Sequence, residues 1–216
     1  MRTNAPFVSA SLAMAALVLL VAGCAPPKEE PTAKDALAYF GIADGKELSF
    51  TGAGGLTETH TYEKNNTFAE REAYDRLVRR GGFAEDDSIF TVEATLEGLQ
   101  IVRFYECLNL CGEPSEPVKM LPWPVEGGEA TETDLTVAVT RNNVDEGTRE
   151  ERHRFQVGSA AEEVTVPAGT FEGFTVLWAR TIDGETTSSQ FVFVPDVGVV
   201  VSEGFDGMRF ELAAAP

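Results

Sequence analysis

Positive charge is scarce in this chain. Its 216 residues include 17 Lys and Arg against 35 Asp and Glu, which gives a formal net charge of -18. Nucleic-acid binding requires a basic surface, and electrostatic attachment to anionic lipid headgroups requires clustered Lys and Arg. The charge balance argues against both kinds of interaction, so we expect no nucleic-acid partner.

Histidine and cysteine are also rare, with 2 His and 3 Cys. His60 and His153 each lie in a segment that alternates like a strand, and we expect both side chains to be exposed to solvent. The sequence contains no Gly-x-Ser-x-Gly nucleophile elbow and no supported Ser-x-x-Lys element. Acidic residues are plentiful, and the stretch from Asn143 to Gly147 resembles part of a calcium loop but favours a hairpin turn, with a weak cation site as the alternative. We therefore expect no enzymatic activity, no metal site and no cofactor, with a hydrolase assembled from distant residues as a remote alternative.

The N-terminal residues MRTNAPFVSASLAMAALVLLVAGC have the organisation of an export signal. Arg2 precedes an apolar stretch over 7–21, which is short for a transmembrane helix. The stretch ends in Val21-Ala22-Gly23-Cys24, which resembles a bacterial lipobox. This resemblance implies cleavage before Cys24 and acylation, including palmitate, of that residue. The alternatives are an ordinary secretory signal with a chance Cys and an uncleaved anchor.

The predicted domain organisation follows from this signal. Residues 1–23 are the lipoprotein signal peptide, 24–35 are the acylated Cys and a Pro-rich flexible tether, and 36–216 form a single β-rich domain. Ala25 occupies the position where Asp retains enteric lipoproteins at the inner membrane. We therefore expect a lipid-anchored protein of the bacterial cell envelope, at the outer membrane and facing the periplasm or the surface.

Short segments rich in β-branched and aromatic residues recur between Gly, Pro and Asp turns, which is typical of an antiparallel all-β domain. The predicted strands are 47–51, 57–63, 88–95, 99–106, 133–140, 149–157, 162–166, 172–182, 187–194, 198–203 and 208–212. Asp183-Gly184 predicts a two-residue hairpin turn. Residues 68–80 are ambiguous: a capping-box pattern favours a helix, and a strand through 74–78 is the alternative. Four arginines gather near this segment, and we expect them to pair with nearby carboxylates: Arg71, Arg76, Arg79 and Arg80.

Three stretches, 116–129, 164–177 and 191–204, resemble a group of uncharacterised bacterial lipoproteins. The second contains the Val-Pro-Ala-Gly-Thr-Phe segment, Val166 to Phe171. The resemblance implies a mainly β fold, with an antiparallel sheet curved into a clam or half-barrel similar to the lipoprotein carriers of the Lol pathway. It implies at most one or two short helices and supplies no catalytic residue.

Cys107 and Cys111 are close in the sequence and, after export, would enter an oxidising compartment. We predict a disulfide between them that closes a short loop. The alternatives are a free thiol pair and a zinc site completed by both histidines.

Apolar side chains alternate along the C-terminal strands. Phe174, Val176 and Trp178 share one face of their strand, and Phe191 and Phe193 share a face of the next. These five residues are core or the lining of a ligand cavity. We expect a non-catalytic structural or interaction module of the envelope, attached to the bilayer through Cys24. The alternative is a carrier of an apolar ligand, such as a lipid or acyl chain, inside the curved sheet.

Overall fold

The computed structural model describes residues 31–68, 71–81, 87–106 and 110–215. Residues 31–216 form one compact unit, which contains every described helix and strand and the buried core. Within the described residues, no helix has both the length and the apolar character needed to cross a membrane.

In the described ranges, the compact unit consists of strands with one α-helix and two short 3-10 helices. The elements in chain order are α1 Ala33–Tyr39, β1 Glu47–Gly52, η1 Ala53–Gly55, β2 Thr57–Lys64, η2 Asn66–Phe68, β3 Ala73–Arg80, β4 Ser88–Thr95, β5 Gly98–Glu106, β6 Leu110–Pro114, β7 Val118–Pro122, β8 Ala130–Arg141, β9 Val144–Val157, β10 Glu162–Val166, β11 Gly169–Ile182, β12 Glu185–Val194, β13 Gly198–Glu203 and β14 Arg209–Leu212.

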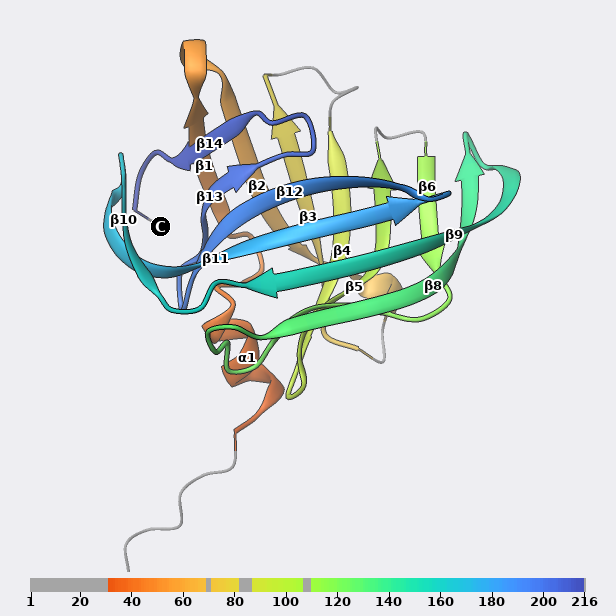
Figure 1. Ribbon diagram of the computed structural model, residues 1–216, viewed down its shortest axis with the longest axis horizontal. Helices are drawn as coiled ribbons and strands as arrows, with labels where there is room; N and C mark the ends of the chain where they lie inside the picture. Colours follow the sequence, from red (N-terminus) through yellow and green to blue (C-terminus); the bar gives the residue numbers. More distant parts are fainter. Residues whose placement is uncertain (1–30, 69–70, 82–86, 107–109, 216) are drawn as a thin grey trace, which may run out of the picture. The chain divides into compact units, whose positions relative to one another are not determined.

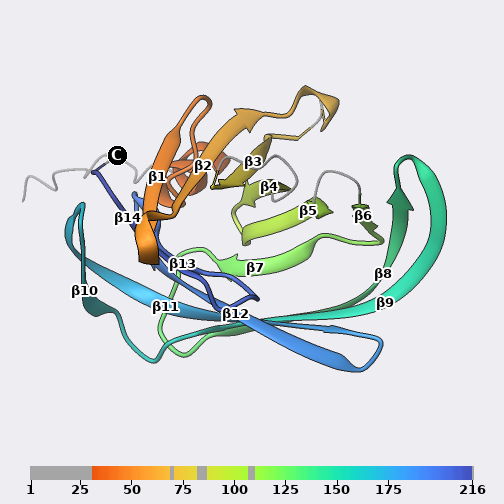
Figure 2. The ribbon, with the colours of Figure 1, turned by 90° about the horizontal axis from the view of Figure 1, so that it is seen from above.

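All of the strands belong to one 14-stranded sheet in the order β10-β11-β12-β13-β14-β1-β2-β3-β4-β5-β6-β8-β9, with β7 paired to β5. Strand β9 also pairs antiparallel with β11, so the path from β11 round to β9 closes into a ring. Figure 1 shows β8, β9, β11 and β12 crossing in front of β1 to β6, and Figure 2 shows the ring from above. The prediction of an antiparallel sheet curved into a clam or half-barrel is confirmed.

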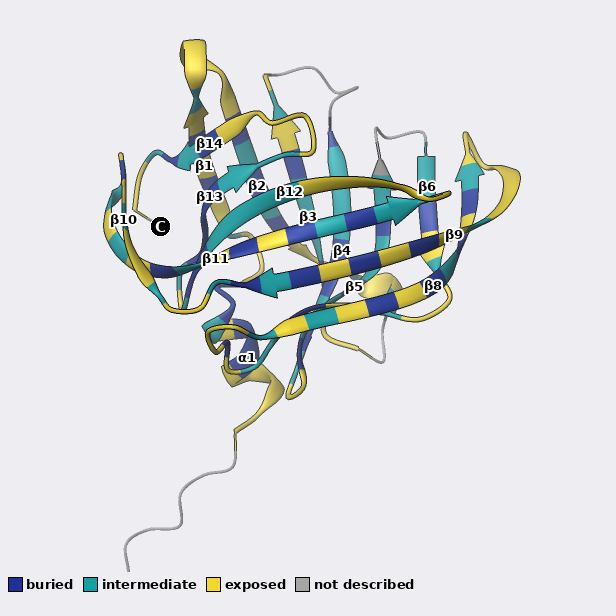
Figure 3. Ribbon diagram, viewed as in Figure 1, coloured by how far each residue is buried: buried dark blue, intermediate teal, exposed yellow. Residues whose placement is uncertain are grey.

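Alternation along the strands decides which side chains lie inside the ring. Strand β8 buries Leu135, Val137 and Val139 and exposes or partly exposes the residues between them, as its coloured bands show (Figure 3). Successive strand side chains point to opposite faces of a sheet, so one face of each long strand fills the interior. Asp183 and Gly184 both have positive φ angles at the β11–β12 turn, as the predicted two-residue hairpin requires.

Helix α1 lies at one end of the ring (Figure 1). The Thr32 side chain accepts a hydrogen bond from the Asp35 backbone N–H, and Asp35 caps the Thr32 N–H in return. The helix buries Leu37, and the following Phe40 packs against Phe193 with ring centroids 5.5 Å apart. The compact unit accordingly begins before Ala36, the expected start of the domain.

The helix favoured for 68–80 is wrong, because Ala73–Arg80 forms strand β3. This strand pairs with β2 on one edge and with β4 on the other, and these two ladders outweigh a local helix-capping pattern. Phe68 ends a 3-10 helix, and Glu70 of the capping pattern lies outside the described residues. Strands β6 and β7 were not predicted, while every predicted strand overlaps an observed one.

Candidate functional site

The inner face of the ring lines a cavity of about 450 Å³ that is partly open to solvent, since its lining includes the exposed residues Thr187, Phe205 and Asp206. Its volume falls within the roughly 300–1,000 Å³ typical of small-molecule sites. Aromatic rings, hydroxyl groups and arginines line it together: His60, Arg76, Val78, Arg80, Ser88, Phe90, Met120, Trp178, Arg180, Thr187, Ser189, Gln190, Phe191, Ser202, Glu203, Gly204, Phe205 and Asp206.

The strand register explains why these side chains converge. Arg76 of β3 is the cross-strand partner of Phe90 of β4, and directly opposed residues in an antiparallel pair point to the same face. On the other wall, Trp178 of β11 is opposite Ser189 of β12. Two hairpins far apart in the sequence thus line the same space.

Aromatic contacts connect the two walls. The rings of Phe90 and Trp178 meet edge to face at 6.1 Å between centroids, and Phe205 meets Trp178 in the same way at 4.9 Å. Phe155 stacks on Trp178 at 5.1 Å. The indole is therefore held on several sides while it also faces the cavity.

A buried charged cluster lies on β2 and β3. Glu58 Oε1 is 2.7 Å from His60 Nε2, and Glu58 Oε2 accepts from Arg80 Nε at 2.5 Å. Arg80 also donates to Asp206 at 2.7 Å, and Arg76 Nη2 donates to His60 Nδ1 at 3.1 Å. Because Nδ1 accepts, His60 carries its proton on Nε2 and donates it to Glu58.

The charges in this cluster shift its pKa values strongly. Burial by itself raises the pKa of Glu58, but the hydrogen bonds and charges of His60 and Arg80 outweigh it and lower the pKa to about 2. Burial and the positive charge of Arg76 lower the pKa of His60 to about 4. The carboxylate is therefore charged and the imidazole neutral at neutral pH.

A second cluster of the same kind lies on β9 and β11. Glu151 accepts from Arg180 Nε at 2.7 Å and Arg180 Nη2 at 3.1 Å, and from Arg149 Nε at 2.6 Å. His153 Nε2 lies 2.9 Å from the same carboxylate, and Trp178 donates its indole N–H to His153 Nδ1 at 3.3 Å. Burial opposes the ionisation of Glu151, but these hydrogen bonds prevail and lower its pKa to about 2.

Both histidines were expected to be exposed, and that expectation is wrong: His60 is 0% exposed and His153 1%. Each lies on the inner face of its strand, two residues after the Glu that holds it. The spacing Glu-x-His-x-aromatic occurs in 58–62 and again in 151–155. In the ring, five strands separate β2 from β9 in either direction, so the two clusters lie on opposite walls. The repeated spacing was the sequence signal that could have revealed them.

Arg76 differs from the other three arginines near β3. Arg71, Arg79 and Arg80 each form an ion pair with a carboxylate, as expected. Across the described residues, no carboxylate lies within 4.0 Å of the Arg76 guanidinium, and its Nε is buried without a hydrogen-bond partner. The expected pairing is therefore not found for Arg76.

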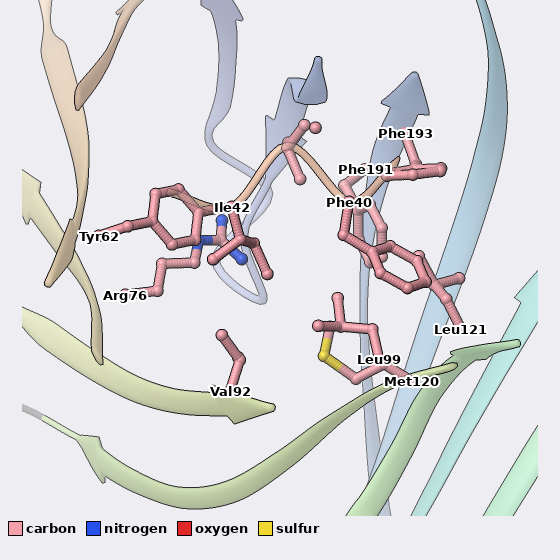
Figure 4. A pocket seen from close by; sticks show the side chains of 12 residues that line it. Phe40, Ile42, Tyr62, Arg76, Val92, Leu99, Met120, Leu121, Phe191 and Phe193 are labelled. Carbon is pink, nitrogen blue, oxygen red and sulfur yellow. The ribbon is translucent and has the colours of Figure 1, made fainter. Parts of the chain in front are cut away.

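Arg76 also borders a smaller cavity of about 30 Å³ next to the end of α1. Figure 4 shows Arg76 beside Tyr62 and Ile42, with Phe191 and Phe193 on the far side. Three residues line both cavities: Arg76, Met120 and Phe191. The smaller cavity is mainly apolar and adjoins the larger, mixed one.

The predicted ligand-contacting residues occupy the interior face. Trp178 and Phe191 line the large cavity, and Phe191 and Phe193 line the small one. Phe174 and Val176 lie on the same face, opposite Phe193 and Phe191 in the register, but line neither cavity. Sequence analysis missed the polar lining, including Arg76.

The cysteine predictions remain untested. Cys24 and Cys107 lie outside the described residues, and Cys111 of β6 is half-buried without a disulfide to any described residue. In the described ranges, no three His, Cys, Asp or Glu side chains are grouped to hold a metal ion.

No family model and none of the curated proteins matches the chain. Two solved structures are similar to it. One, from Bacteroides fragilis, is described as a candidate exported protein with a YmcC-like fold: identity is 11%, the match covers 82% of this chain and 98% of that one, and the TM-score is 0.36. The other, from Parabacteroides distasonis, is described as a candidate lipoprotein, with 12% identity, 87% and 100% coverage and a TM-score of 0.37. These values are too low to assign a family or a function to this chain.

Proposed function

We propose that this protein is a non-catalytic binding protein of the bacterial cell envelope, attached through acylated Cys24, that holds an apolar or amphiphilic small molecule inside the ring. The observation that carries the proposal is the cavity of about 450 Å³ with Phe90, Trp178 and Phe205 on its walls. Aromatic side chains that line a solvent-accessible pocket can be covered favourably by a ligand.

The polar lining supports binding rather than catalysis. Both buried carboxylates, Glu58 and Glu151, are engaged by arginine and histidine partners. Each histidine uses one nitrogen on a carboxylate and the other on Arg76 or Trp178. Neither imidazole has a free nitrogen with which to act as a base. The clusters therefore act as fixed parts of the wall.

A neutral fluorescent probe, phenylnaphthylamine, tests the proposal on residues 31–216. We expect saturable binding of about one probe per chain, and quenching of Trp178 emission in a Trp123→Phe background. Ser189→Phe should abolish binding because Ser189 lines the cavity opposite Trp178.

Ser188→Phe is the matched control, because Ser188 is exposed on the other face of the same strand. This variant should bind the probe like the wild type. If the probe does not saturate, or if both Phe variants bind it equally well, the binding proposal is wrong. The envelope interaction module expected from the sequence would then be the better description.

A further inference from the structure

One cation in the cavity wall, Arg76, has no carboxylate partner among the residues that the structure describes. Of the three arginines that line the large cavity, Arg80 is paired with Glu58 and Asp206, and Arg180 with Glu151. Arg76 has only a neutral imidazole, His60 Nδ1, at 3.1 Å. Its Nε is buried and has no partner among the described residues.

Several side chains around the half-buried Arg76 are apolar. Its cross-strand partners are Tyr62 on β2 and Phe90 on β4, and it shares the junction of the two cavities with Met120 and Phe191. A charge removed from water in such a place is costly unless an opposite charge and hydrogen bonds compensate it. Burial and then the charge of Arg76 lower the pKa of His60 to about 4, so the neighbouring imidazole is neutral at pH 7 and supplies no charge that would balance the guanidinium.

We propose that Arg76 is the anchor for the anionic group of the ligand, and that the ligand is a monoanion: a carboxylate joined to an aromatic or aliphatic body. This inference rests on the proposed binding function. A guanidinium matches a carboxylate with two parallel hydrogen bonds. The Arg76 side chain borders the pocket, and because its Nε is enclosed, a rotation of the side chain on binding is needed for Nε to donate to the carboxylate. The apolar body lies against Phe90 and Trp178.

The charge of the whole chain narrows the ligand class further. A net charge of -18 repels anions at long range, and more strongly the more charges they carry. A single local cation in an aromatic cavity can outweigh this repulsion for a monoanion with a large apolar part. Polyphosphates and other polyanions without an apolar body are poor candidates.

Two probes that share one ring system separate the anion site from the cavity. Anilinonaphthalene sulfonate carries one negative charge, and phenylnaphthylamine is its neutral counterpart. In residues 31–216, Arg76→Met should weaken binding of the sulfonate probe about tenfold or more, the usual effect of losing a charged hydrogen-bond partner. Binding of the neutral probe should change less than about twofold.

Arg79→Met is the matched control, because Arg79 is on the same strand but exposed, and pairs with Asp87. It should leave both affinities unchanged. Displacement of phenylnaphthylamine by decanoate and by decanol tests the carboxylate directly: the wild type should prefer decanoate, and Arg76→Met should lose that preference. Arg76→Lys keeps the charge without the planar fork of the guanidinium and should retain part of the preference for decanoate. This variant provides the test if circular dichroism shows that Arg76→Met does not fold.

The outcomes separate the two proposals. One outcome keeps the cavity proposal: phenylnaphthylamine binds and Ser189→Phe abolishes its binding. If Arg76→Met then weakens the binding of both probes equally, or of neither, the proposed anion site is wrong. A wild type with no preference for decanoate over decanol also overturns the anion site. If neither probe binds the wild type, both proposals fail.

Discussion

The indole N–H of Trp178 donates to Nδ1 of His153 across 3.3 Å. Because an indole nitrogen can only donate, Nδ1 of His153 must accept and its proton lies on Nε2, which is 2.9 Å from Glu151. Glu151 in turn holds Arg180 through two hydrogen bonds. The indole of Trp178, which lines the cavity, is thus oriented by a buried ion pair. The stability of the fold and the shape of the cavity therefore depend on the same contacts.

Glu151→Gln should destabilise the domain by roughly 3–5 kcal/mol, the usual cost of breaking a buried ion pair from one side. The Glu151 side chain is fully buried and accepts from Arg149, Arg180 and His153, so its loss leaves buried cations without their anion. Urea unfolding at neutral pH measures the change. The adjacent Glu150 is exposed and contacts Thr136, so Glu150→Gln should cost less than about 1 kcal/mol. Similar unfolding midpoints for the two variants would contradict this account.

His60 should make the domain sensitive to mild acid. Its folded-state pKa of about 4 lies below its ordinary value of 6.5, so the unfolded chain binds the extra proton first as the pH falls. Stability is therefore lost between pH 6.5 and pH 4, by roughly 3 kcal/mol for this group. Glu58, with a folded pKa of about 2 against an ordinary 4.5, contributes stability that is present above pH 4.5 and lost as the pH falls toward 2.

His60→Gln isolates the upper pH window. The Gln amide can donate to Glu58 and its carbonyl can accept from Arg76, but it does not titrate. The variant should be less stable than the wild type at pH 7.5, and most of that difference should disappear at pH 4.5. Urea titrations at the two pH values measure it. An identical pH dependence in both proteins would refute the assignment to His60.

The sequence predicted the strands whose pattern lies within the strand itself, and missed or misjudged those that depend on their neighbours. Alternating apolar residues identified the long strands, because each long strand buries one face whatever its partner. Strand β3 carried a competing capping pattern, and the short strands β6 and β7 have little alternation of their own. Pairing with neighbouring strands fixed these elements: β3 lies between β2 and β4, β6 lies between β5 and β8, and β7 pairs with β5.

The candidate site was predicted less well than the fold. Trp178 and Phe191 were identified because their strands are apolar on the inward face. His60, His153 and Arg76 were misjudged because closing the ring through β9 and β11 encloses polar residues that an open sheet would leave in solvent. The pairing of β9 with β11 places residues 144–157 and 169–182 across the ring from β2 and β3, which lie about a hundred residues earlier in the sequence. A signal within one strand cannot reveal such a contact.

Gly98 should be intolerant of a side chain. It begins β5 with φ +133°, and a Cβ there would lie 2.0 Å from the carbonyl oxygen of Leu121 in β7. Gly98→Ala should therefore cost about 3 kcal/mol or more. Gly54 also has a positive φ, +70°, but open space around it, so Gly54→Ala should cost only about 1 kcal/mol of backbone strain. Thermal unfolding compares them, and equal losses would show that the approach of β7 is not the cause.

Cys24 should carry the acyl chains that hold the protein at the membrane. The Val21-Ala22-Gly23-Cys24 pattern predicts thioether and amide acylation of this one residue, and several chains give stable anchoring where a single chain is marginal. Palmitate fed to cells should label the wild type but not Cys24→Ser, while Cys111→Ser should be labelled like the wild type. Label retained in Cys24→Ser would overturn the assignment. Ala25 stands where Asp would retain an enteric lipoprotein at the inner membrane, so the labelled protein should co-sediment with outer-membrane fractions. Co-sedimentation with the inner membrane would overturn that placement but not the assignment of acylation to Cys24.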